Sequence, residues 1–169
     1  MKAMVYFGLS ILILSVLPAV TEASEHDGIP PETVADYIHA VIEADRTFYT
    51  IHVVERLQKG EGPVASEDWR AKKNLLPLPA QFLRESSDLA AKTGSTIRYR
   101  LISLWPINPD NAPYGDVERK GLETVRDHPE RAATATVTVG KQVYLQAIYP
   151  DHAVSHACIA CHNAHPRSP

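Results

Sequence analysis

Apolar side chains recur every three to four residues from Glu32 to about Lys59, which is the period of one face of an α-helix. Pro31 suits the first turn of such a helix, and Gly60 suits its end. At about 100° per residue, one apolar stripe holds Val34, Ile38, Val41, Phe48, Tyr49 and His52. His52 falls near the centre of this stripe, so the pattern predicts a long N-terminal helix that buries an imidazole.

The rest of the chain alternates between helical and strand patterns. Residues 79–93 and 116–127 have helical periodicity, and residues 61–78 and 106–113 are rich in loop-forming residues. Residues 96–105 alternate and carry β-branched side chains, which indicates a strand. Residues 132–139 and 142–149 flank Gly140-Lys141, which indicates a hairpin. We therefore predict an α+β domain with an antiparallel sheet of at least three strands, followed by a loop or short turn.

The first 23 residues have the pattern of an export signal. Lys2 precedes an apolar stretch from Val5 to Val20, and Ala23 is a suitable cleavage position. An uncleaved membrane anchor is the alternative, although the stretch is shorter than the roughly 20 residues that a spanning helix needs. We expect a signal at 1–23, a flexible lead-in at 24–31, a single domain at 32–169 and a periplasmic or otherwise exported location.

Composition excludes one class of partner. The formal net charge is -3, so the chain lacks the basic surface by which proteins bind nucleic acids. The sequence also has no paired carboxylates, nucleophile–base motif or phosphate-binding loop. We therefore do not expect an enzyme.

The run Cys158-Ile159-Ala160-Cys161-His162 contains the only two cysteines of the chain. C-x-x-C-H is the attachment sequence of c-type haem. The two thiolates each form a thioether to the same porphyrin, and the imidazole of His162 becomes the proximal iron ligand. The sequence therefore predicts one covalent haem c, and export agrees with it because bacteria attach this haem outside the cytoplasmic membrane.

Two haem-free interpretations of the run stay open. Cys158 and Cys161 match the spacing of a redox dithiol or a disulfide, neither of which needs the adjacent histidine. Together with His162 and His165 they also match the residue types of a zinc site. Adjacent Cys161 and His162 would both have to bind the same zinc ion, which is awkward for a tetrahedral site.

The sixth iron ligand is open in the sequence. Met1 and Met4 are the only methionines, and both lie in the export signal, so a His/Met pair requires an uncleaved signal. The remaining ligands are a histidine, a lysine, water or none. His52 is the first candidate because of its place on the stripe; His39, His152, His156 and His165 are the others. Two histidine ligands give a six-coordinate iron, which does not suit oxygen-activating chemistry.

Four stretches resemble one known family. They are FYTIHVVERLQ (48–58), LPLPAQFLRE (76–85), YRLISLWPINPDNAPYGDVERKGLE (99–123) and YLQAIYPDHAVSHACIACHNAHP (144–166). Over about residues 32–169 the chain resembles exported domains that bind c-type haem, have a PAS-like fold and carry a C-terminal CxxCHNxHP. These are catalogued as a domain of unknown function, and they are often the sensing part of bacterial signalling proteins.

The resemblance implies a haem cradled by a PAS-like sheet, attached at Cys158 and Cys161 and ligated by His162. It also implies a distal ligand from the first helix, the segment that holds His52. We therefore expect a monohaem c-type cytochrome that acts as a redox or gas sensor or as an electron carrier. No signalling module is recognisable in this sequence, so a separate redox or signalling protein is the expected partner. Arg98 and Arg100 are candidates for facing the haem propionates. The alternative is a haem-free thiol-disulfide or zinc-binding module.

Overall fold

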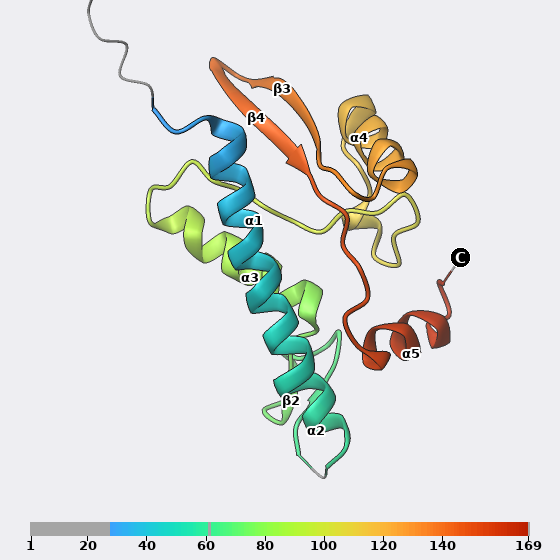
Figure 1. Ribbon diagram of the computed structural model, residues 1–169. Coiled ribbons are helices and arrows are strands. Elements are labelled where there is room, and N and C mark those ends of the chain that lie inside the picture. The colour runs from blue at the N-terminus through green and yellow to red at the C-terminus, as the bar shows by residue number, and fades with distance from the viewer. Residues whose placement is uncertain (1–27, 61, 169) are drawn as a thin grey trace, which may run out of the picture.

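The computed structural model describes residues 28–60 and 62–168 (Figure 1). The predicted signal and residues 24–27 of the lead-in lie outside these residues. The helices are α1 (Pro31–Phe48), the π-helix η1 (Tyr49–Glu55), α2 (Arg56–Gln58), α3 (Pro79–Lys92), the 3₁₀-helix η2 (Pro109–Asn111), α4 (Gly115–Asp127) and α5 (His156–Ala164). The strands are β1 (Val64–Ala65), β2 (Leu75–Leu76), β3 (Ala133–Val139) and β4 (Gln142–Ile148). None of the described helices is both long and apolar enough to cross a membrane.

The predicted N-terminal helix is present and runs down the front of the molecule in Figure 1. α1, η1 and α2 follow one another without interruption, with Pro31 in the first turn. The middle segment is a π-helix, in which hydrogen bonds join residues five apart rather than four. Each residue of a π-helix therefore turns the chain by less than in an α-helix. Beyond Phe48, a projection at the α-helical angle therefore overestimates how far each side chain is rotated around the helix axis.

The inner face of α1 differs from the predicted apolar stripe. Ile38 and Ile42 face inwards, but so do His39 and Arg46, and Arg46 is buried. Val41 and Phe48 of the predicted stripe are instead 62% and 63% exposed. The prediction of a buried His52 is wrong, because this residue is exposed.

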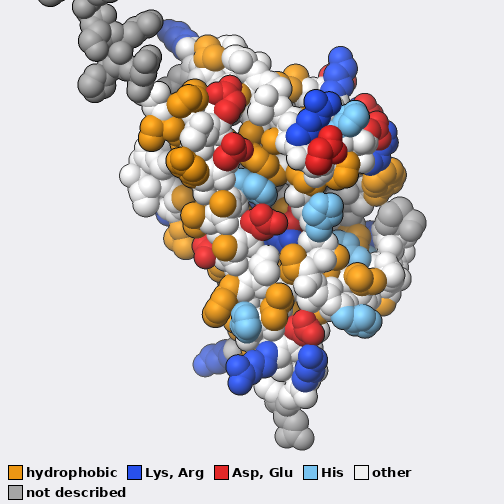
Figure 2. Space-filling view, in the orientation of Figure 1, with side chains coloured by type: hydrophobic (Ala, Val, Ile, Leu, Met, Phe, Trp, Pro, Cys, Tyr) orange, Lys and Arg blue, Asp and Glu red, His pale blue; other side chains and the backbone are white. Residues whose placement is uncertain are grey.

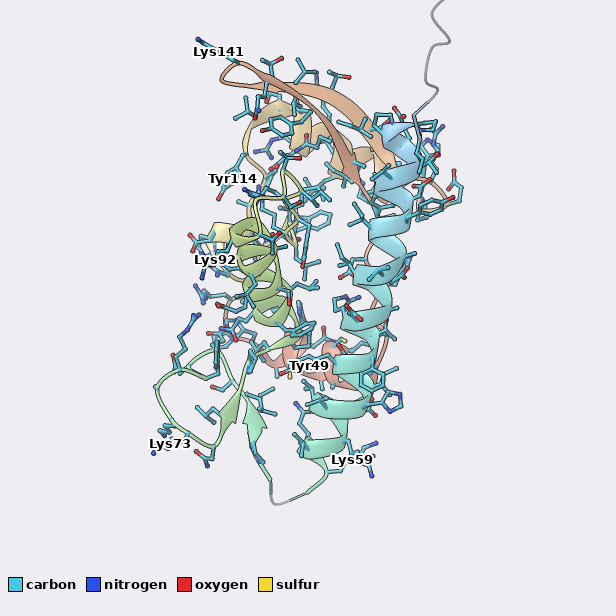
Figure 3. The ribbon with its side chains drawn as sticks, turned by 90° about the vertical axis from the view of Figure 1, so that its left-hand side faces the viewer. Tyr49, Lys59, Lys73, Lys92, Tyr114 and Lys141 are labelled. Atoms are coloured by element: carbon cyan, nitrogen blue, oxygen red, sulfur yellow. The ribbon has the colours of Figure 1, made fainter. Side chains whose placement is uncertain are left out.

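α3 packs beside the long helix and anchors it through aromatic rings. The rings of Tyr49 and Phe82 are stacked with centroids 4.6 Å apart, and the Tyr49 hydroxyl donates to the Pro77 carbonyl at 2.7 Å. Figure 3 shows Tyr49 between the two helices. Burial raises the pKa of the Tyr49 phenol. Leu83, on the inner face of α3, is among the most buried side chains of the described residues.

The predicted hairpin is confirmed. β3 and β4 pair antiparallel from Ala133↔Ile148 to Val139↔Gln142, and Gly140 supplies the positive φ of 63° at the turn. α4 covers this hairpin, with Val125 and Ile148 buried in the contact. Together with the helices, the hairpin and the short parallel pair of β1 and β2 make the described chain an α+β structure.

The predicted strand at residues 96–105 is wrong. This segment has no regular structure, although its side chains from Tyr99 to Leu104 are half-buried. Two of its backbone N–H groups donate to groups that are not part of a strand. Tyr99 N–H donates to the Ser87 hydroxyl at 3.2 Å, and Ser103 N–H donates to the Asn111 carbonyl at 2.9 Å. The antiparallel sheet of the described residues therefore has two strands, not the three or more that we predicted.

Candidate functional site

The C-x-x-C-H run lies on α5, not in the loop or short turn that we predicted. Ser155 begins this helix, and its hydroxyl accepts from the Ala157 N–H at 3.1 Å. Ala157 is buried and fixes the first turn against the rest of the domain. Residues three apart on a helix share a face, so Cys158 and Cys161 project from the same side, one turn apart. Both thiols are free; Cys158 is half-buried and Cys161 is exposed.

An ion pair between the long helix and the segment before α5 fixes where α5 begins. The buried Arg46 guanidinium contacts the Asp151 carboxylate and donates to the His152 carbonyl at 3.1 Å. Burial raises the pKa of Asp151, while the Arg46 charge opposes this effect. α5 also packs directly against η1. The C-x-x-C-H run is therefore held against the N-terminal helix both by this packing and by the ion pair.

The far end of α5 has a second anchor. The His165 Nε2 atom lies 3.3 Å from Glu67 Oε1, and the Nδ1 atom accepts from the Arg167 N–H at 3.1 Å. These contacts tie the end of the helix to the loop that follows β1. They also occupy both ring nitrogens of His165, so this imidazole is poorly placed to bind iron.

A large, partly open cavity of about 2510 Å³ lies between α1, α3, the 95–108 segment, β4 and α5. Cys158, Cys161 and His162 are part of its wall, as are Trp69 and Trp105. The cavity exceeds the roughly 300–1,000 Å³ of an ordinary small-molecule pocket. Only five apolar residues of the described chain are buried: Val54, Leu83, Val125, Ile148 and Ala157. Many inward-facing apolar side chains therefore line the cavity instead of closing a solid core.

The structure sorts the candidate distal histidines into two groups. His39, His152 and His165 line the same cavity as Cys158, Cys161 and His162, whereas His52 and His156 do not. The His52 ring lies on the outer side of the long helix, 4.8 Å from the Phe48 ring. His39 stacks on Tyr149 at 3.9 Å. Figure 2 shows several histidines gathered over the middle of this face of the molecule.

Comparison with known proteins identifies the family. A family model described as Tll0287-like matches residues 30–169. The chain belongs to the Tll0287-like family. No curated protein and no solved structure matches this Tll0287-like chain. The comparison does not bear on the haem or on the PAS-like fold that the resemblance implied, and both stay predictions.

The donor set of this Tll0287-like domain is compatible with a covalent haem. Two free thiols and an imidazole project from one short helix that borders the large cavity, and their residue types and spacing are those that c-type haem uses. In contrast, no three His, Cys, Asp or Glu side chains of the described residues gather closely enough to hold a metal ion. The four residues considered for zinc are thus not brought together.

The two arginines suggested for the propionates are both part of the cavity wall, but they have protein partners. Arg100 donates to Glu118 at 2.6 Å, and its guanidinium lies 3.9 Å from the centre of the Tyr114 ring. Arg98 donates to the carbonyls of Ser95 and Ile97, each at 2.7 Å. Arg100 is therefore part of a structural cluster around Glu118, and Arg98 stabilises its own loop.

Sequence reasoning missed the ion pair that positions α5. Arg46 is a charged residue on a helix whose neighbours in the turn, Ile42 and Thr50, also face inwards. A charge at a core-facing position is a signal that a partner of opposite charge must be buried with it. In the structure that partner is Asp151, just after the proline that ends the hairpin.

Proposed function

We propose that this Tll0287-like protein is a monohaem c-type cytochrome that works outside the cytoplasmic membrane as a redox sensor or electron carrier. The observation that carries the proposal is the placement of Cys158, Cys161 and His162 on one short helix in the wall of a cavity larger than ordinary ligand pockets. The pattern of residues 1–23 supports the location.

In this proposal the residues of the chain have separate tasks. Cys158 and Cys161 hold the porphyrin through thioether bonds, and His162 is the proximal ligand. The bound haem supplies one-electron oxidation and reduction. Arg46 and Asp151 fix the approach of α5 to the long helix, and His165 fixes its end. The apolar wall of the cavity keeps water from the group.

For the sixth ligand, the cavity favours His39 and His152 over His52. An iron ligand must reach the cavity that His162 borders, and these two residues line it. Two histidine ligands give a low-spin iron with a potential below that of a His/Met site, because methionine raises the potential.

The first experiment tests attachment. The chain is produced with the c-type maturation machinery and examined by intact mass and by its pyridine haemochrome spectrum. We expect the added mass of one haem in the wild-type protein and in the surface control His128→Ala, and no covalent haem in the double variant Cys158→Ser/Cys161→Ser. A wild-type chain without added mass would sink the proposal. Loss of two hydrogens instead would support the thiol-disulfide alternative.

The second experiment tests the sixth ligand in the loaded protein. His39→Ala and His152→Ala are compared with His52→Ala by visible and electron paramagnetic resonance spectra, and by carbon monoxide binding in the reduced state. We expect one of the first two variants to become high-spin and to bind carbon monoxide, and His52→Ala to resemble the wild type. A change to high spin in His52→Ala alone would restore the prediction from the sequence.

A further inference from the structure

The outer side of α1 carries an apolar stripe that the domain does not use. We call Val34, Tyr37, Val41, Ala44 and Phe48 the outer stripe; all five are exposed, and Val34, at the edge of the stripe, also borders the cavity. The inward-facing residues of the same helix, such as Ile42 and Arg46, lie on the opposite side. Figure 2 shows hydrophobic side chains along α1 on the face turned to the viewer. A contiguous apolar stripe of this kind on the surface marks an interaction site.

The spacing of the outer stripe matches a partner helix. Its members follow one another at intervals of three, four, three and four residues, the a and d positions of a heptad repeat. Such a seam favours another helix as occupant over an extended peptide. The continuous helix from Pro31 to Gln58 offers a long support for it.

The sizes of the side chains indicate that the partner is a second copy of this chain. The stripe has a large aromatic ring towards each end, Tyr37 and Phe48, and the small residues Val41 and Ala44 between them. If two copies pair antiparallel about a two-fold axis between Val41 and Ala44, Tyr37 of each copy faces Phe48 of the other. Val41 then faces Ala44, and the small residues let the helices approach closely. An interface of two identical patches must be self-complementary in this way.

Charge favours the same orientation. The ends of the helix differ in net sign: Glu32 and Asp36 lie near the start, whereas near the end Arg56 and Lys59 outnumber Glu55, the ion-pair partner of Lys59. Antiparallel pairing brings each acidic start to the basic end of the other copy, whereas parallel pairing places like charges together. The helix dipoles also oppose one another only in the antiparallel arrangement.

We propose that the protein self-associates through the outer stripe as an antiparallel pair of α1 helices. This interface does not depend on the haem, and of the outer stripe only Val34 borders the cavity. A single helix pair buries less than roughly 1,200 Å², the range of transient complexes. We therefore expect a reversible dimer with a dissociation constant on the order of 10–100 μM.

Sedimentation equilibrium of the full, haem-loaded chain between about 1 and 300 μM, concentrations that bracket the expected constant, tests the proposal. We expect Val41→Lys to weaken the dimer at least about tenfold, because it places a charge in the seam. Val143→Lys is the matched control, since Val143 is 68% exposed on the hairpin and far from the stripe in sequence. Circular dichroism establishes that each variant is folded.

The double variant Val41→Lys/Ala44→Glu tests the orientation. In the antiparallel pair the introduced lysine faces the introduced glutamate of the other copy, so the dimer should recover; in a parallel pair like charges meet and it should not. A wild-type protein that stays monomeric at the highest concentration, or a dimer unaffected by Val41→Lys, would overturn the proposal. Failure of the double variant to recover would overturn the antiparallel arrangement. Binding of the monomer to phosphatidylglycerol vesicles would assign the stripe to a membrane surface instead.

Discussion

At the scale of single residues, Gly121 marks a close approach between α4 and the hairpin. A Cβ atom added at this position would lie 2.5 Å from the Ile148 Cδ1 atom, closer than non-bonded carbons approach, whereas the next atom of Ile148 is 3.5 Å away. Ile148 is buried, so its side chain would have to shift within this contact to make room. Glycine is therefore favoured at position 121 because a side chain there would clash with Ile148, and not because the backbone has a positive φ.

Gly121→Ala should lower the free energy of unfolding by about 1 kcal/mol, because overpacking costs roughly 1–3 kcal/mol and alanine returns roughly 1 kcal/mol of helix propensity. In an Ile148→Val background, which lacks Cδ1, the same change should be neutral or stabilising. Urea denaturation of the four proteins measures this. An equal loss in both backgrounds would contradict the packing argument. Gly60→Ala, at an open position near the end of the long helix, serves as the control.

Tyr149 links the hairpin to α1 and should make stability depend on alkaline pH. Burial, and then its hydrogen bond to Asp36 at 2.7 Å, raise the pKa of this phenol. Above pH 10, about the unperturbed value, the unfolded chain loses the proton while the folded chain keeps it. Stability should therefore fall as the pH rises beyond about 10.

We expect Tyr149→Phe to be less stable than the wild type at neutral pH, because the Asp36 hydrogen bond is lost, but to lose less stability between about pH 9 and 11. Thermal denaturation across this range checks the prediction. Tyr37→Phe on the exposed face of α1 is the control. Parallel pH profiles for Tyr149→Phe and the wild type would rule out the link to this phenol.

At the scale of secondary-structure elements, Arg46 and Asp151 determine how α5 joins the rest of the fold. The two partners are unequally buried: the Arg46 side chain is 7% exposed and that of Asp151 is 42% exposed. Removing the carboxylate leaves a buried positive charge without a partner. Removing the guanidinium leaves a carboxylate that water can reach.

Asp151→Ala should therefore destabilise the domain more than Arg46→Met, by up to about 3 kcal/mol, the lower end for a broken buried ion pair. Guanidinium denaturation of both variants and of the double variant gives the comparison. If Arg46→Met were the more harmful change, the packing of the arginine stem, and not its charge, would be its main contribution.

The elements that the sequence predicted are those set by local pattern. The long helix, α3, α4 and the hairpin each follow from periodicity and from a boundary residue such as Pro31 or Gly140. Residues 96–105 have a strand pattern too, but a strand needs a neighbour, and Ser87 and Asn111 take the hydrogen bonds instead. The pattern could not reveal this competition between distant groups.

In the candidate site, too, the local sequence pattern was predictable, whereas the position of a side chain relative to distant residues was not. The attachment run was evident because its five residues are consecutive, whereas the place of His52 depended on the angle of the helix. The π-helix begins at Tyr49, and no residue pattern announced it. Its wider turn helps to explain why His52 lies on the outside, and the inward positions go to polar residues with partners, such as Arg46 and Thr50.

At the scale of the whole molecule, the large cavity predicts that haem loading and stability are coupled. A group that binds only the folded state stabilises it, and a porphyrin would cover apolar wall that is otherwise in contact with water. The loaded protein should melt higher than Cys158→Ser/Cys161→Ser by roughly 5 °C or more, which corresponds to about 2 kcal/mol for a domain of this size. Calorimetry measures the difference. Equal melting temperatures in folded samples would mean that the cavity wall does not enclose the haem.

The positions of Trp69 and Trp105 in the cavity wall give the molecule an internal optical reporter. They are the two tryptophans of the chain, and a porphyrin absorbs at the wavelengths where indole emits. Energy transfer over such short distances would leave the loaded protein nearly dark under ultraviolet excitation and the unloaded protein bright. The emission of an untreated sample would then report directly what fraction of its molecules carries the prosthetic group.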